Sequence, residues 1–413
     1  MRYIADFHIH SKYSRATSKT MTLDSLNIWA KLKGINIIGT GDFTHPVWFE
    51  GLRDDLQQNR NGLYVLKSDP QSVFFIPTAE LSCIYKKNNK VRRIHVVIFL
   101  PNLESVEKFN KILEKDGYNL KSDGRPILGI DAKELLKIVL DVSKDALFVP
   151  AHIYTPWFSV LGASSGFNSV EECFEELTPQ IFALETGLSS DPEMSWTNSK
   201  LDRFTLISNS DAHNPENLGR EANVFDLDKL SYVSLIEAIK NKKNFSYTIE
   251  FFPEEGKYHL DGHRACGIVI PQDETARDYQ VCPVCGTPLT VGVFHRVKEL
   301  ADRKVPTQPA LSPNFKKIIP LKEIIAQIND VGKASKKVAS QYLEFIRQVK
   351  GGEFEALLNT SEDDLKKVGS SLLAEAIVKM REGKVTKQAG YDGVYGKITI
   401  LTKQQKACQA DLF

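Results

Sequence analysis

The sequence lacks three features that would each point to a class of protein. None of its apolar runs reaches the length of a membrane span, which argues against a membrane protein. The chain opens on a strand-like Tyr3-Ile4-Ala5 without a charged and then apolar leader, so we expect a cytoplasmic location. A net charge of only +1 argues against a strongly basic nucleic-acid wrapper but allows a local basic face.

Cysteine is also scarce. Only six cysteines occur, and two of them form Cys282-Pro-Val-Cys285. In a cytoplasmic protein this pattern indicates metal binding and not a disulfide framework. The 413 residues, 42% hydrophobic and 25% charged, describe a globular chain long enough for two or three domains.

Residues 1 to about 250 alternate apolar, strand-like stretches with helix-like ones such as 23–32 and 132–142. Apolar strands buried between helices favour a mainly parallel sheet. Seven such units predict an α/β fold with a closed or nearly closed β/α barrel, in which the carboxyl ends of the strands face the active site. The predicted strands are 3–10, 35–41, 73–79, 94–100, 146–151, 181–185 and 204–209.

Histidines and carboxylates recur where these strands stop. His8 and His10 alternate with other residues along one strand and therefore share a face, while Glu80 could bridge two ions with its two oxygens. A lone strand histidine is usually structural, and several of these residues could be polar loop residues. A mixed set suits Zn²⁺, Mn²⁺ or Fe²⁺, with Mg²⁺ also open. The set is Asp6, His8, His10, Asp42, His45, Glu80, His95, His152, Glu185, Asp211 and His213.

In order and roughly in spacing, this set resembles the polymerase and histidinol phosphatase (PHP) superfamily of metal-dependent phosphoesterases. The resemblance covers residues 1–250 and implies a distorted (β/α)7 PHP barrel with two or three divalent ions that stabilise charge on phosphate oxygens. It implies ligands to a first ion, namely His8, His10, Glu80 and Asp211. It implies a second ion on Glu80, His95 and His152, and a third on His213.

The resemblance also implies catalytic roles for Asp6, Asp42 and Asp211, with Asp6 orienting a histidine from behind. One stretch departs from the superfamily. Where a Thr-Asp-His run is usual, this chain has residues 40–45, with Phe43 in the place of the histidine. Asp42 or His45 could then replace the missing ligand of the third ion.

A second metal site is predicted in residues 251–310, a segment with few long apolar runs. Cys282 and Cys285 form one half of a tetrahedral zinc site, and Cys266 lies sixteen residues ahead of them. His263 is the expected fourth ligand of this structural zinc. His259 and His295 are the alternatives.

Helical periodicity returns in residues 315–387, where turns at Gly332-Lys333 and at Gly369 each separate two helical stretches. They resemble degenerate helix-hairpin-helix elements, whose backbone N–H groups can hold a DNA phosphate. An ordinary helical cap domain is the alternative.

Taken together, the PHP-like barrel, the Cys-Pro-Val-Cys-Gly knuckle, the helical segment and Tyr391-Asp-Gly-Val-Tyr-Gly resemble the endonuclease Q family. The resemblance implies a DNA-repair enzyme that nicks double- or single-stranded DNA on the 5′ side of hypoxanthine, uracil, xanthine or an abasic site. Stacking against such a base is expected of aromatic residues in loops, unless they belong to the core. The candidates are Phe43, Trp48, Trp157 and Phe158. The competing hypotheses are a histidinol-phosphatase-like small-molecule phosphatase and a DNA-binding adaptor with a degenerate barrel.

The last segment, residues 388–413, ends in Gln409-Ala410-Asp411-Leu412-Phe413. This peptide resembles the Gln-x-x-Leu-Phe motif by which bacterial repair proteins dock on the replication sliding clamp. A polar tail would present Leu412 and Phe413 to a preformed apolar pocket, with Gln409 at its rim. A functionless end is the alternative.

Overall fold

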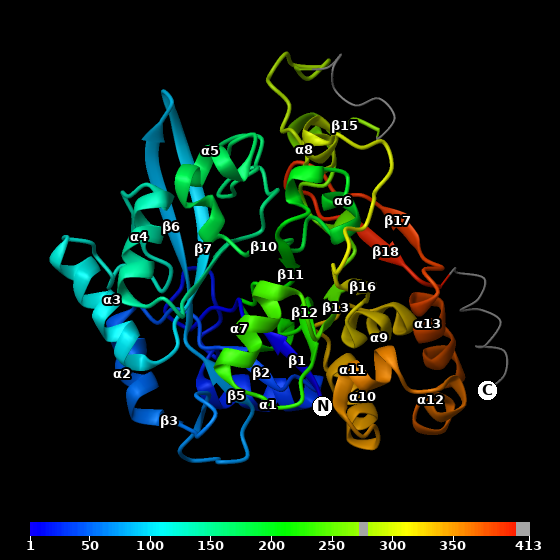
Figure 1. The fold of residues 1–413 in the computed structure, drawn as a ribbon. Coiled ribbons are helices and arrows are strands. Elements are labelled where there is room, and N and C mark those ends of the chain that lie inside the picture. Colours follow the sequence, from blue (N-terminus) through cyan, green and yellow to red (C-terminus); the bar gives the residue numbers. More distant parts are fainter. Residues whose placement is uncertain (272–279, 402–413) are drawn as a thin grey trace.

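The computed structural model describes residues 1–271 and 280–401. An α/β body formed by the N-terminal half lies beside a group of helices from the C-terminal third, and a small segment of residues 251–310 sits at the top of the view in Figure 1. Within the described ranges, no helix combines the length and the apolar character needed to cross a bilayer.

Each of the seven predicted strands overlaps a strand of the α/β body, but β3, β4, β8, β12, β13 and β16 were not predicted. Its largest sheet runs in the order β16-β13-β12-β1-β2-β5-β4-β3, and a second runs β8-β6-β7-β9. The strands are β1 (Arg2–Asp6), β2 (Ile37–Gly39), β3 (Leu56–Gln58), β4 (Tyr64–Leu66), β5 (Phe74–Ile76), β6 (Thr78–Lys87), β7 (Lys90–Phe99), β8 (Ile127–Leu128), β9 (Leu147–Pro150), β10 (Ala183–Glu185), β11 (Thr205–Ile207), β12 (Ala222–Asp226), β13 (Phe245–Glu250) and β16 (Asn314–Lys317).

The predicted mainly parallel sheet is wrong, and a closed seven-stranded barrel is not confirmed. β1 pairs parallel with β2 but antiparallel with β12, and β6, β7 and β9 form an antiparallel series. The ladders are interrupted between the sheets, where single hydrogen bonds join the strand ends. Examples are Ile153 N–H to Glu185 O at 3.0 Å and His10 N–H to Ala212 O at 3.0 Å. The strand ends therefore still face one region.

The predicted strand 73–79 is two strands. Pro77 has no N–H for a ladder, and it separates β5 from β6. β6 then runs ten residues into a tight hairpin with β7, whose turn residues Asn88 and Asn89 have positive φ angles of 53° and 58°. Glu80 consequently lies near the start of a long strand and not at the end of a short one.

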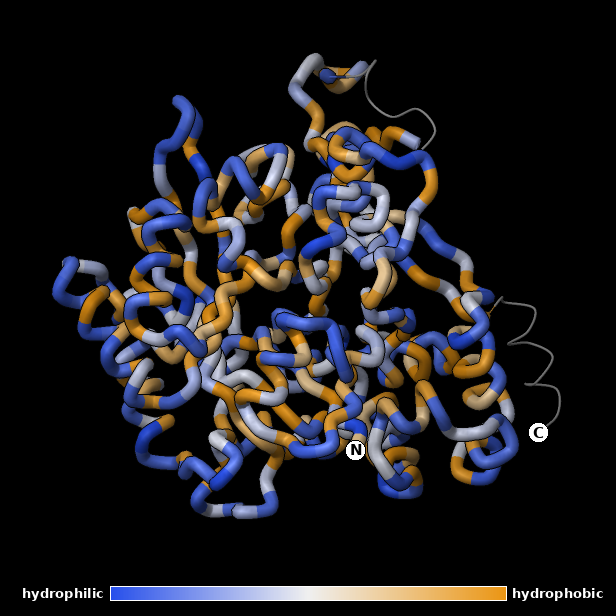
Figure 2. Tube along the Cα trace, viewed as in Figure 1, coloured by the Kyte–Doolittle hydropathy of each residue, from blue (hydrophilic) through white to orange (hydrophobic). Residues whose placement is uncertain are grey.

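Helices cover the body, and one of them matches its predicted range. α4 (Ala132–Val142) begins after Asp131, whose side chain accepts a hydrogen bond from the N–H of Lys133. Figure 2 shows hydrophobic positions along the interior strands and hydrophilic ones in the outer loops. The other helices of the body are α1 (Leu23–Lys33), α2 (Pro46–Asp55), α3 (Leu103–Lys115), α5 (Val170–Phe174), α6 (Pro192–Ser195) and α7 (Tyr232–Asn241).

The C-terminal helices form where helical periodicity predicts them. They are joined to the α/β body by a strand pairing and by a buried ion pair. β16 pairs in parallel with β13 and so belongs to the main sheet. The Lys33 ammonium of α1 lies 2.9 Å from the Glu353 carboxylate of α11, and both are buried. These elements are β14 (Gly262–His263), β15 (Ile268–Val269), α8 (Val293–Leu300), α9 (Leu321–Asn329), α10 (Lys336–Gln348), α11 (Gly352–Leu358), α12 (Glu362–Val368), α13 (Ser371–Arg381), β17 (Thr386–Gln388) and β18 (Lys397–Thr399).

Candidate metal centre

The structure brings His8, His10, Glu80 and Asp211 together, with one donor atom of each within 4.8 Å of the others. His10 Nε2 lies 3.0 Å from Asp211 Oδ1 and 3.3 Å from Glu80 Oε2. His8 Nε2 lies 3.5 Å from Glu80 Oε2. β1 ends at Asp6, so the two histidines lie just beyond the strand and not within it.

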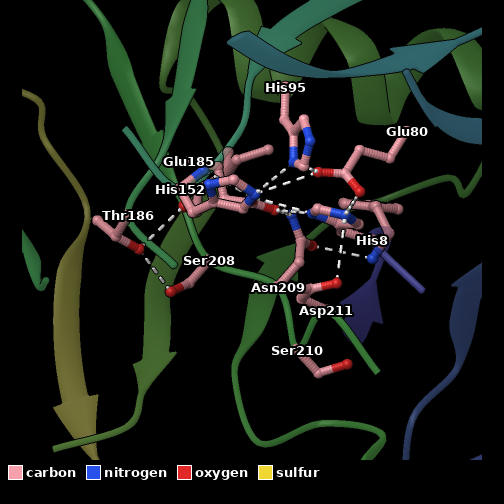
Figure 3. Close-up of polar contacts among 12 residues, drawn as sticks. His8, Glu80, His95, His152, Glu185, Thr186, Ser208, Asn209, Ser210 and Asp211 are labelled. Carbon is pink, nitrogen blue, oxygen red and sulfur yellow. Dashed lines mark hydrogen bonds and ion pairs between the residues drawn. The ribbon is translucent and has the colours of Figure 1, made fainter. Parts of the chain in front are cut away.

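A second group shares Glu80. Its Oε1 lies 2.7 Å from His95 Nδ1 and 3.1 Å from His152 Nε2, and all three side chains belong to one cluster of candidate ligands. In Figure 3 the rings of His8, His95 and His152 gather around the Glu80 carboxylate. Glu80 thus occupies the bridging position between the two groups, as its two oxygens allow.

The donor set fits divalent metal ions. His8 Nε2 is buried, has no hydrogen-bond partner within the described residues and points to the carboxylates of its group. An imidazole nitrogen left in this way loses its hydration without compensation unless a cation takes its lone pair. Burial lowers the pKa of His95 to about 4, which keeps that imidazole neutral as ligation requires.

Two buried carboxylates hold the first pair of histidines from behind. Glu185 Oε2 lies 2.9 Å from His8 Nδ1 and also accepts the N–H of His152. Asp42 Oδ1 lies 3.0 Å from His10 Nδ1. Each carboxylate fixes the ring whose other nitrogen faces the cluster, an arrangement common around protein-bound metals.

Asp6 does not orient a histidine, contrary to its predicted role. Its two oxygens accept the N–H groups of Ser210 and Gly219, at 3.1 Å and 2.9 Å. Burial raises the pKa of Asp6 to about 6. Asp6 therefore anchors the loop that carries Asp211, and Glu185, which the sequence marked as a metal-type residue without a role, supports His8 instead.

An arginine that sequence analysis missed enters the cluster. Arg125 Nη1 donates to Glu80 Oε2 at 2.8 Å, and its side chain is 27% exposed. Its positive charge helps to hold the pKa of Glu80 well below the usual range, against burial, which raises it. A single arginine in an irregular loop gives no periodic signal, so the sequence could not single it out.

The residues predicted for a third ion do not join either group. His213 Nδ1 faces its neighbour's backbone, 2.9 Å from Asp211 O. His45 stacks on Tyr13 with ring centroids 4.3 Å apart. Asp42 turns its second oxygen to the Ser11 N–H. Among the described residues of this site, two groups of three or more candidate ligands come together, and a third ion stays a prediction.

Two of the four predicted base-stacking aromatics are wrong. Phe43 is fully buried against Phe109, and Trp48 is buried with its indole N–H bonded to Gly41 O at 2.9 Å. Both side chains therefore belong to the hydrophobic core and do not face a DNA base. Trp157 and Phe158 are partly exposed, and the Phe158 ring lies 4.6 Å from that of His95.

The predicted structural zinc site is assembled with the expected fourth residue. Donor atoms of His263, Cys266, Cys282 and Cys285 all lie within 4.8 Å of one another. His295 instead pairs with an aspartate, its Nδ1 2.7 Å from Asp261 Oδ2. A tetrahedral zinc needs four such donors and no more.

The turns of the helical segment give a mixed result. Gly332 is exposed and the Lys333 ammonium is paired with Glu323 at 2.7 Å. A side chain at Gly369 would collide with the Phe345 ring, so this glycine serves the packing of α12 on α10. A phosphate contact at these turns stays a prediction. The clamp-binding residues Gln409, Leu412 and Phe413 lie outside the described residues.

The α/β body brings together two groups of candidate metal ligands that share Glu80, and residues 200–244 match the family model described as PHP-associated. Residues 320–384 match the model of the MJ0043 C-terminal domain. The chain is 30% identical to the uncharacterized protein YqxK of Bacillus subtilis over 409 residues, 95% of this chain and 98% of YqxK. It is 33% identical to protein MJ0043 of Methanocaldococcus jannaschii over 280 residues, which are 65% of this chain but only 34% of MJ0043.

Two solved structures match nearly the whole chain. One is the lesion-specific endonuclease PfuEndoQ from Pyrococcus furiosus, with a TM-score of 0.84 and 32% identity over 97% of this chain and 96% of that one. The other is endonuclease Q in complex with a 27-mer duplex that carries an abasic lesion at the active site. It has a TM-score of 0.87 and 32% identity over all of both chains. The chain belongs to the endonuclease Q family.

Proposed function

We propose that this protein is a DNA-repair endonuclease that hydrolyses the phosphodiester on the 5′ side of a deaminated or missing base. The observation that carries the proposal is the pair of clusters that share Glu80, with His8 Nε2 buried near carboxylates but without a hydrogen bond among the described residues. Two divalent ions at such a site would bind a phosphate group. The likeness to a lesion-specific endonuclease over nearly the whole chain supports DNA as the molecule that contains this phosphate.

His8, His10, Glu80 and Asp211 would hold one divalent ion, and Glu80, His95 and His152 a second. Such ions stabilise the charge on phosphate oxygens and raise the acidity of water. The protein's own groups keep this site in order. Glu185 and Asp42 orient the histidines, and the Arg125 guanidinium adds positive charge beside the place of the phosphate.

The lesions we propose are hypoxanthine, uracil, xanthine and the abasic site. The homologous complex with an abasic duplex supports the last of these. Weakly paired or missing bases cost least to expose, which favours such lesions over normal pairs. The test is incubation of 5′-end-labelled duplexes, each with one lesion, with metal-reconstituted protein.

A nick immediately 5′ to the lesion, absent from the undamaged duplex and abolished by a chelator, is the expected result. Hydrolysis of small phosphomonoesters without any nick would instead support a phosphatase. Nicking that survives exhaustive chelation would contradict the metal centre.

We further propose the division into residues 1–250 for the PHP barrel, 251–310 for a module around one structural zinc, 315–387 for a DNA-contacting helical domain, and 388–413 for a tail. The active-site ions are Zn²⁺, Mn²⁺, Fe²⁺ or Mg²⁺, which metal analysis of protein purified without chelators would distinguish. DNA as substrate is consistent with a cytoplasmic, nucleoid-associated location.

The sliding clamp is a proposed partner through Gln409, Leu412 and Phe413. Docking two apolar side chains would raise the local concentration of the nuclease on DNA without a large interface. Deleting the last five residues should leave cleavage of short oligonucleotides unchanged and abolish co-purification with the clamp. Clamp binding that survives the deletion would show that the motif is a coincidence.

A further inference from the structure

Aromatic rings from three separate parts of the chain lie close to one another beside the metal centre. Phe158 lies against His95, and the next residue, Trp157, makes an edge-on contact with Tyr258 at 5.4 Å between centroids. Tyr395 follows, since the Lys257 ammonium lies over both tyrosine rings, at 5.5 Å and 5.9 Å. We call Phe158, Trp157, Tyr258 and Tyr395 the aromatic strip.

The strip is not part of the core. Tyr395 is 71% exposed, and the other three rings are partly exposed. A ring that only packs the fold would be buried, as Phe43 is. A mostly exposed tyrosine near other rings is instead free to receive another flat group on its face.

Cations accompany the strip along its length. The Arg93 guanidinium lies 5.7 Å from the Phe158 ring, Lys257 lies between the two tyrosines, and Arg264 Nη1 is 3.3 Å from where a side chain at Gly393 would begin. All three cations are exposed, and in the ranges 1–271 and 280–401 none pairs with a carboxylate. Unpaired cations beside exposed rings present charge for an anionic partner.

The zinc module, residues 251–310, which we also call the cysteine-rich module, holds the turn that carries Tyr395. The Arg264 N–H and the Thr290 hydroxyl both donate to the Asp392 carboxylate, at 2.6 Å each. The N–H of Gly393 donates to Lys257 O at 2.8 Å. The turn that carries Tyr395 is thereby held against residues of the zinc module.

We propose that the aromatic strip binds the unpaired nucleotides next to the cleaved phosphate, with bases on the rings and phosphates on Arg93, Lys257 and Arg264. The inference rests on the proposed function, which places a DNA phosphate at the metal centre beside which the strip lies. Stacking on aromatic rings beside a positive track is how proteins hold single strands without reading sequence.

The test measures binding of a fluorescein-labelled oligothymidylate and of an abasic duplex by anisotropy. The variants are made in an Asp211→Asn background to prevent cleavage, and the buffer contains no chelator, so that the structural zinc stays bound. Trp157→Ala and Tyr395→Ala should each raise Kd about fivefold to 100-fold, as expected for the loss of one stacked base. Tyr395→Phe keeps the ring and should restore most of the affinity. Because Tyr395 is mostly exposed, its alanine variant should unfold at the wild-type temperature, so the loss cannot come from misfolding.

Charge is tested with a matched pair. Lys257→Gln should reduce the slope of log K against log salt for the single strand by about 0.7, the share of one phosphate contact. Lys144→Gln removes an exposed lysine ahead of β9, at the end of the strand opposite His152, and should leave the slope unchanged.

Failure of the strip and failure of the proposed function give different results. If the wild type nicks the abasic duplex while both alanine variants bind DNA as the wild type does, the strip is wrong and the function stands. If the alanine variants lose oligothymidylate binding while the wild type nicks no lesion, the strip stands and the proposed function is wrong. A loss of small-phosphodiester hydrolysis as large as the loss of DNA binding would assign these rings to the metal site and overturn the proposal.

Discussion

Asp211 is the residue whose loss tests the metal centre most directly. Its carboxylate lies 3.0 Å from His10 Nε2 and its side chain is 30% exposed, so an amide fits without crowding. Asp211→Asn should reduce nicking of an abasic duplex by at least about 100-fold, because one anionic ligand is lost, while the Kd for DNA stays within a few-fold. Single-turnover cleavage and anisotropy measure the two effects. Near-normal turnover in this variant would rule out the assignment of the ligand.

Glu185 tests the support behind the ligands. A glutamine oxygen could still accept from His8 Nδ1 and from the N–H of His152, which now contact Oε2 at 2.9 Å and 3.0 Å. Its NH2 group, however, would face the Asn209 Nδ2–H that donates to Glu185 Oε1 at 2.8 Å, and the negative charge behind His8 would be lost. We expect Glu185→Gln to weaken metal binding by about 10- to 100-fold, measured by competition with a chromophoric chelator. Glu171→Gln, an exposed change elsewhere in the body, is the control. Equal metal affinity in both variants would leave Glu185 without a positioning role.

At the scale of the element, the cysteine-rich module depends on its metal because its own core is small. Among the described residues around the cysteines, Ile270, Cys282 and Leu289 form a small buried cluster separate from the main core. Cys282→Ser should remove one zinc per chain, unfold the module locally and weaken lesion binding more than hydrolysis of a small phosphodiester. Lesion binding should weaken more than hydrolysis because the module holds the turn of Tyr395, which belongs to the proposed DNA-binding aromatic strip.

The control lies in the same knuckle. Val284 is 68% exposed between the two cysteines, and Val284→Ser should keep both zinc and DNA affinity. A Cys282→Ser variant that retains the wild-type zinc content would refute the structural site.

At the scale of the whole molecule, Glu250 couples folding to pH. It is fully buried where β13 meets β16, and burial raises its pKa to about 8. The folded state therefore holds a proton that the unfolded chain releases near its normal pKa, and the resulting stability is lost as pH rises from about 4.5 to about 8.

Glu250→Gln should remove the share of this loss that Glu250 contributes, while the buried Glu221, whose pKa burial also raises, keeps its own share. The unfolding temperature of the variant relative to the wild type should rise between pH 5 and pH 9, by about 2 °C or more at the upper end. Thermal unfolding followed by circular dichroism at both pH values measures the difference. Exposed Glu344→Gln should show no such dependence on pH, and a parallel response of the two variants would refute the role of Glu250.

The candidate ligands could be predicted from the sequence because each stands in a local pattern that neighbouring residues of the chain define. His8, His10, Glu80 and His152 stand at or just beyond apolar strands whose local pattern survives in the folded chain, and Cys282 with Cys285 form a knuckle within four residues. The range of α4 likewise follows from its own periodicity and from the capping side chain of Asp131.

What the sequence could not decide are contacts between residues far apart in the chain. The roles of Glu185 and Arg125 depend on carboxylate and histidine neighbours more than 30 positions away. The core position of Phe43 depends on Phe109 of α3, which packs against it. The direction of the strands was wrong for the same reason, since pairing is chosen between segments and not within them. By itself the sequence indicated the candidate ligands and many of the local elements. Only the tertiary structure decided which groups meet, because burial and hydrogen bonding belong to neighbours in space and not to neighbours in the chain.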